Sequence, residues 1–131
     1  MANFKKDLNI RSTEYLYLFI EAGILHCVYK DVALVDLEIA KSCVKDRLEF
    51  IGDNIYPSLF DITRIKQSTK EARDYMANEG NDQVSASAIL ISSPMLKMTA
   101  NFYIMVNKPK NPTRMFTDKT TALEWLAKFK V

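Results

Sequence analysis

Glycine and histidine are scarce in this chain. Its 131 residues include only three glycines and one histidine. Phosphate-binding loops depend on several glycines, whereas Gly23, Gly52 and Gly80 are each explained by a turn or a helix end. No G-x-x-x-x-G-K-[ST], G-x-S-x-G or H-E-x-x-H pattern occurs. The sequence therefore argues against the common nucleotide-dependent and hydrolase chemistries, and we expect no cofactor.

The usual metal ligands are also missing. His26 is the single histidine, and Cys27 and Cys43 lack the spacing of a zinc motif. Neighbouring residues of a strand point to opposite faces, which makes Cys27 a poor partner for His26. We therefore expect no metal, a structural histidine and two buried free thiols in a reducing compartment. A disulfide between the cysteines is the open alternative.

The chain has neither an excess of one charge nor a long apolar run. The net charge is +2, which is too small to indicate nucleic-acid binding. No apolar run follows the basic start, so no secretory signal is visible. The most apolar segment, 95–106, is too short and too interrupted to cross a bilayer. With 48% apolar and 26% charged residues, the chain is typical of one soluble domain, and a cytoplasmic location follows by default.

Aromatic and β-branched residues predict a hairpin near the start of the chain. Strands are expected at 14–20 and 24–29, with the turn at Gly23, and 32–35 either extends the second strand or forms a short one. Asp36 is expected to cap a helix that stops at Gly52. The remaining expected elements are a strand at 55–61, a helix at 70–79, a strand at 84–91, a helix at 94–107, a strand at 114–116 and a helix at 119–129.

This order, β-β-α-β-α-β-α-β-α, defines the expected fold class. Alternating helices and strands predict an α/β domain with a mostly parallel sheet, an N-terminal hairpin and about four helices. Residues 1–13 are polar and are expected to be a partly ordered N-terminal segment. Residues 14–131 are expected to form a single domain.

The segment 94–107 is more apolar than a surface helix needs to be. A surface helix carries one apolar stripe, but apolar residues here point in nearly every direction around the axis. The surplus predicts burial in the fold, a subunit interface or an apolar ligand groove, and methionine suits the last two. The candidate ligand or partner surface consists of Met95, Met98, Phe102 and Met105.

Three segments of the chain resemble a known family. They are Gly23-Ile24-Leu25-His26 with Tyr29-Lys30, Leu59-Phe60-Asp61-Ile62 with Lys70-Glu71-Ala72-Arg73, and Phe116-Thr117-Asp118 with Ala122-Leu123-Glu124-Trp125-Leu126. In these residues and in its element order, the chain resembles the small bacterial STAS-like domains, which have the SpoIIAA-like fold of the anti-sigma-factor antagonists. The branch is often described as STAS/SEC14-like. The resemblance implies a regulatory or ligand-binding module and not an enzyme.

The resemblance also points to a candidate site. The antagonists carry a phosphorylatable serine at the start of their second helix, and the corresponding region here is 61–70. Asp61 and Thr63 match the family in type, but its acidic residue and its glycine are absent. Ser68 and Thr69 are therefore possible phosphoacceptors, with capping of the helix as the alternative. Asp61 and Thr63 form a possible polar site at a strand end, with capping of a loop as the alternative.

Two functions from different classes follow. The first is a non-enzymatic regulatory module of STAS type that acts through protein contacts, as a homodimer and with a regulatory protein partner. The second is a carrier or sensor of a small apolar, lipid-like ligand in a groove beside 94–107. An enzyme that uses Asp61 and Thr63 is a third hypothesis, and we expect the chain not to be one.

Overall fold

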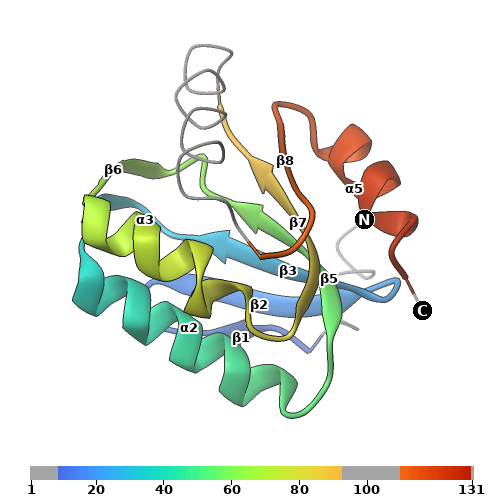
Figure 1. The fold of residues 1–131 in the computed structure, drawn as a ribbon, viewed down its shortest axis with the longest axis horizontal. Helices are drawn as coiled ribbons and strands as arrows, with labels where there is room; N and C mark the ends of the chain where they lie inside the picture. The colour runs from blue at the N-terminus through green and yellow to red at the C-terminus, as the bar shows by residue number, and fades with distance from the viewer. Residues whose placement is uncertain (1–8, 93–109, 131) are drawn as a thin grey trace.

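The structure is a computed structural model that describes residues 9–92 and 110–130. These residues form a six-stranded sheet with helices on both faces and a separate two-stranded sheet (Figure 1). The elements are β1 (Arg11–Ser12), β2 (Leu16–Glu21), β3 (Ile24–Tyr29), β4 (Val32–Val35), α2 (Leu37–Ile51), β5 (Tyr56–Asp61), β6 (Ile65–Ser68), α3 (Lys70–Ala77), the 3-10 helix η1 (Glu79–Asn81), β7 (Val84–Leu90), β8 (Thr113–Phe116) and α5 (Lys119–Ala127).

The large sheet confirms the predicted hairpin and the mostly parallel pairing. Its strand order is β1-β2-β3-β5-β7-β8. The first three strands are antiparallel, and β3, β5, β7 and β8 pair in parallel. The β2–β3 turn places Ala22 and Gly23 at φ 53° and 78°, and two successive positive φ angles are typical of a tight two-residue hairpin loop.

Helix α2 begins and ends where the sequence predicts. The Asp36 carboxylate accepts a hydrogen bond from the Ile39 N–H at 2.9 Å, which satisfies one free donor of the first turn. At the other end, Gly52 has φ 62° and donates its N–H to the Leu48 carbonyl at 3.0 Å. A left-handed residue at this position is favourable for glycine.

The two faces of the sheet are covered by different helices. Alternate residues of a strand point to opposite faces. Leu25 and Phe60 pack in one core cluster with α2 residues, whereas Ile24 and Leu59 pack in another with α5 residues. Helix α3 lies beside α2 and extends that layer through Ala72, which packs near Ala40.

Some elements differ from the sequence-based expectation. Strands β1 and β6 were not predicted, and β4 is a separate strand that pairs in parallel with β6. Helix α3 ends at Ala77 and is followed by η1, so it stops before the predicted position. The described residues contain three α-helices, and the expected helix at 94–107 lies outside them.

Candidate functional site

The segment from the end of β5 through β6 to the start of α3 contains four of the residues that the sequence singled out. Strands β3, β5, β7 and β8 are parallel, so their carboxyl ends meet at one edge of the sheet, where α/β folds commonly bind ligands. Asp61 is the last residue of β5, and Thr69 immediately precedes α3. The chain between them includes Thr63 and Ser68, which lies on β6 of the two-stranded sheet, so these four residues lie on one connection that starts at this edge.

Asp61 and Thr63 contact each other directly. Asp61 Oδ1 accepts hydrogen bonds from the Thr63 N–H at 3.1 Å and from the Thr63 hydroxyl at 2.6 Å. An aspartate that binds the backbone two residues later fixes a turn. The carboxylate oxygen that faces Thr63 therefore holds the loop, as the capping alternative predicted.

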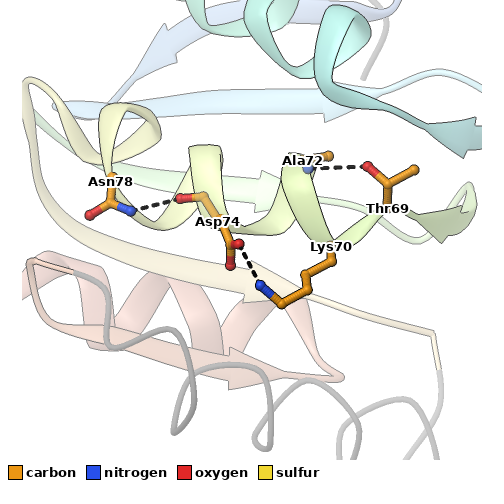
Figure 2. A network of polar contacts seen from close by, with 5 residues as sticks. All are labelled: Thr69, Lys70, Ala72, Asp74 and Asn78. Carbon is orange, nitrogen blue, oxygen red and sulfur yellow. Dashed lines mark hydrogen bonds and ion pairs between the residues drawn. The ribbon is translucent and has the colours of Figure 1, made fainter.

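Ser68 and Thr69 are neighbours in sequence but have different roles. The Thr69 hydroxyl accepts a hydrogen bond from the Ala72 N–H at 3.1 Å and so caps α3 (Figure 2). Ser68 is the last residue of β6 and is half-buried. Arg73 Nη1 donates to the Ser68 carbonyl at 2.6 Å and lies 3.3 Å from the Ser68 hydroxyl oxygen. Only Thr69 is required as the helix cap.

The first turns of α3 place positive charge beside these hydroxyls. Lys70 Nζ lies 3.0 Å from Asp74 Oδ2 in an exposed ion pair one helical turn long (Figure 2). Arg73 is the residue before Asp74 in the same helix. Its guanidinium points towards the helix start, where it donates a hydrogen bond to the Ser68 carbonyl. Of these two cationic side chains of α3, Arg73 is the one that contacts Ser68.

The single histidine lies inside the fold. His26 on β3 is only 1% exposed, and its ring stacks on that of Phe19 with centroids 4.5 Å apart. Burial, together with the positive charge of Lys119, lowers the pKa of His26 to about 4, so the ring is neutral at physiological pH. These surroundings are typical of a structural histidine.

Both cysteines are buried free thiols in the core between the sheet and α2. Burial raises the pKa of Cys27 and of Cys43 to about 12. A thiol is nucleophilic as its thiolate, so neither cysteine is activated. The disulfide alternative does not apply to this structure.

A buried arginine in the same layer was not predicted. Arg47 of α2 is 2% exposed, and its guanidinium lies over the Phe60 ring at 5.6 Å. Its Nη2 donates to the Asp82 carbonyl at 3.1 Å, while its Nε has no partner among the described residues. The signal that indicates burial is its spacing, because position 47 lies one helical turn from both Cys43 and Ile51.

Two adjoining shallow hollows lie where β8 leads into α5. Their volumes are about 160 and 230 Å³, and Arg114, Phe116 and Thr121 line both. The Arg114 guanidinium lies 5.5 Å from the Phe116 ring, and Trp125 tilts against that ring at 5.7 Å. Trp125 is partly buried and packs against the core cluster under α5.

Within residues 9–92 and 110–130, no three histidine, cysteine or acidic side chains gather as metal ligands. None of the helices in these ranges is long and apolar enough to cross a membrane. The proposed partner surface of Met95, Met98, Phe102 and Met105 lies outside the described residues.

Comparison with known proteins identifies the fold. The family model described as "Domain of unknown function (DUF7793)" matches residues 18–130. An uncharacterized protein of the DUF3478 family from Shewanella loihica PV-4, which has a SpoIIAA-like fold, is similar with a TM-score of 0.55 and 13% identity, over 91% of each chain. A protein with unknown function from Arthrobacter sp. FB24 matches at 27% identity and a TM-score of 0.35, over 90% of this chain and 97% of the other. No curated protein matches. The fold is thus SpoIIAA-like, as the three sequence segments implied.

Proposed function

The chain belongs to the DUF7793 family, and we propose that it is a non-enzymatic protein-interaction module of STAS type that acts as a homodimer in the cytoplasm. The observation that carries this proposal is the contact between Arg73 and Ser68 at the start of α3. The Ser68 hydroxyl oxygen lies 3.3 Å from Arg73 Nη1 and is not needed as a cap, because Thr69 performs that function. A modification of Ser68 would therefore change the charge of the surface without removing the helix cap.

The charges around Ser68 suit a regulatory phosphate. A phosphoserine adds close to two negative charges and several acceptor oxygens. At this position it would meet the Arg73 guanidinium, which already lies within reach, and the positive end of the α3 dipole. The added negative charge would also alter the surface that a partner contacts. We therefore propose Ser68 rather than Thr69 as the phosphoacceptor.

The non-enzymatic part of the proposal is supported by the positions of the reactive groups. His26 is buried against Phe19, and both thiols are buried and protonated. The Asp61 oxygen that faces Thr63 is engaged in the loop. Covalent catalysis usually needs a nucleophile and a base within hydrogen-bond reach, with the base oriented by a third group. The Thr63 hydroxyl and Asp61 are within reach of each other, but the same carboxylate oxygen also accepts from the Thr63 N–H and so holds the turn of the loop.

Site-specific photo-crosslinking in the cells that make the protein tests the interaction surface. A photoreactive phenylalanine analogue replaces Gln67, which is exposed on β6, and a matched control replaces Lys45, which is exposed on α2. We expect a defined protein adduct from position 67 and none from position 45. Equal labelling at both positions, or none at either, would contradict the proposal.

Intact mass of protein from the same cells tests the phosphoacceptor. We expect a fraction that carries one phosphate, which Ser68→Ala removes and Thr69→Ala leaves in place. The two variants also differ in stability, because loss of the cap in Thr69→Ala costs about 1 kcal/mol of unfolding free energy. If no phosphorylated fraction appears under any growth condition, Ser68 has no such role.

The alternative function stays a prediction. Carriage of an apolar ligand was inferred from Met95, Met98, Phe102 and Met105, which lie outside the described residues. Native mass spectrometry of freshly purified protein tests it, and a co-purifying lipid would favour the carrier over the interaction module.

A further inference from the structure

The β4–β6 ribbon (residues 32–35 and 65–68) forms a two-stranded sheet of its own, and β6 lies at the margin of the fold (Figure 1). In both strands the end residues are buried or half-buried and the two middle residues are exposed. A regular strand would instead alternate between the two faces. The pairing register accordingly omits Ala33 opposite Lys66, so the centre of the ribbon is irregular and presents both middle residues of each strand to solvent.

The inward residues fasten the ribbon to the core. Val32 and Val35 belong to a buried cluster that includes residues of α2 and α3, and Ile65 packs against this cluster. At the end of the ribbon, the Thr69 N–H donates to the Val35 carbonyl at 3.0 Å. A surface that is already held in place loses little conformational freedom when a partner binds to it.

The outer face of the ribbon carries an exposed aliphatic side chain. Leu34 on β4 is 45% exposed, and its partner in the pairing register is Gln67, which is also exposed. A single exposed leucine is common at protein surfaces. The charges beside Leu34 therefore decide which kind of partner this face can bind.

Those charges have one sign. Residues 64–70 contain three cationic side chains and no acidic one. Lys70 is paired with Asp74, whereas Arg64 and Lys66 are exposed and form no ion pair with any residue that the structure describes. Two unpaired cations thus lie next to the exposed leucine of the ribbon.

We propose that an acidic segment of a partner protein docks on the outer face of the β4–β6 ribbon, with an apolar side chain against Leu34 and carboxylates facing Arg64 and Lys66. This inference rests on the interaction module of the proposed function and names the chemistry of its partner. Complementary charge selects this occupant. A second copy of the chain would bring the same cations against each other, because a twofold interface joins one patch to itself.

The photo-crosslinking experiment at Gln67 tests this chemistry directly. Tandem mass spectrometry of the adduct should place the crosslink in a partner segment that has more acidic than basic residues. In the same chain, Arg64→Glu replaces attraction by repulsion, and we expect the adduct yield to fall about tenfold. Leu34→Ser removes only an apolar contact, and we expect a fall of about threefold.

Matched controls separate the ribbon from the rest of the surface. Lys45→Glu reverses an exposed charge on α2, and Ile55→Ser removes an apolar side chain that is 62% exposed outside the ribbon. Neither should change the adduct yield. All four substituted side chains are exposed, so circular dichroism should show that every variant is folded.

The outcomes distinguish this inference from the proposed function. A defined adduct whose partner segment is basic or uncharged would overturn the acidic partner while the interaction module stands. An Arg64→Glu variant that retains as much adduct as Lys45→Glu would do the same. The absence of any adduct from position 67 would overturn both.

Discussion

The two faces of the sheet are packed with different kinds of residue. On the α5 face, Ala86, Ala88 and Ala122 are fully buried and bring the helix close to β7. On the α2 face, the core contains a charged side chain, Arg47, and a phenol, Tyr29, both almost completely buried. Close packing of α5 on the sheet therefore depends on small side chains. Packing of α2 on the other face has to accommodate the polar groups of Arg47 and Tyr29.

This difference extends to the titratable groups. The α5 face contains His26, which shares its orientation on β3 with Ile24 and whose pKa is lowered by burial. The α2 face contains Cys27 and Cys43, whose pKa values are raised by burial. We therefore expect acid to destabilise the protein through the α5 face and alkali to destabilise it through the α2 face. The variants below test this contrast, beginning with the largest expected change in stability.

Added volume should be most damaging under α5. Ala122→Leu places three extra carbon atoms in a fully buried contact, and we expect the free energy of unfolding to fall by about 3 kcal/mol or more. Ala127→Leu adds the same atoms on the exposed side of the same helix and should change it by less than about 0.5 kcal/mol. Urea denaturation of both variants measures the difference, and equal losses would show that the alanine contact is not close-packed.

Acid should destabilise the protein through His26. The folded pKa is about 4 and the ordinary value is 6.5, so the unfolded chain binds the proton more readily between these values. The stability gained from the neutral ring is present above about pH 6.5 and is lost as the pH falls towards 4, by about 3 kcal/mol in total.

His26→Phe is the matched control for this titration, because it keeps a ring against Phe19 but cannot be protonated. The difference in unfolding free energy between wild type and variant should change steadily from pH 6.5 to pH 4. A difference that stays constant with pH would contradict the prediction. NMR of the single histidine gives its folded pKa directly.

Alkali should act on the opposite face. The thiol pKa values rise from 9.0 to about 12 on folding, so stability is complete below about pH 9 and falls as the pH rises above it. We expect a loss of about 2 kcal/mol per thiol by about pH 10.5. Comparison of wild type with Cys27→Ala isolates one thiol, and a loss that is identical in both proteins would exclude Cys27 as its source.

Arg47 should tolerate a change of charge better than a loss of volume. Arg47→Met keeps most of the buried stem and removes a buried cation, and we expect an unfolding free energy within about 1 kcal/mol of wild type or higher. Arg47→Ala also removes the stem that packs near Phe60 and should cost about 3 kcal/mol. If Arg47→Met is as unstable as Arg47→Ala, the hydrogen bond to the Asp82 carbonyl matters more than the packing.

The candidate site was predictable where it depended on neighbours in sequence. Asp61 with Thr63, and Thr69 as a cap, follow from the preference of these residue types for binding backbone two or three positions away. The contact of Arg73 with Ser68 was not predicted, because it also requires β6, and the short run 65–68 has few of the residues that indicate a strand. The hollows beside β8 depend on three segments that only the fold brings together.

The sequence by itself determined the local features of this protein. The caps at Asp36 and Gly52, the hairpin at Gly23 and the alternation of helices and strands are decided by residues within a few positions of each other. Only the tertiary structure decided that the Arg47 guanidinium lies over Phe60 and bonds the Asp82 carbonyl, that β4 pairs with β6 and that β8 forms an edge beside Trp125. These features depend on contacts between distant segments, whose free energy is set by packing and pairing partners that no local pattern specifies.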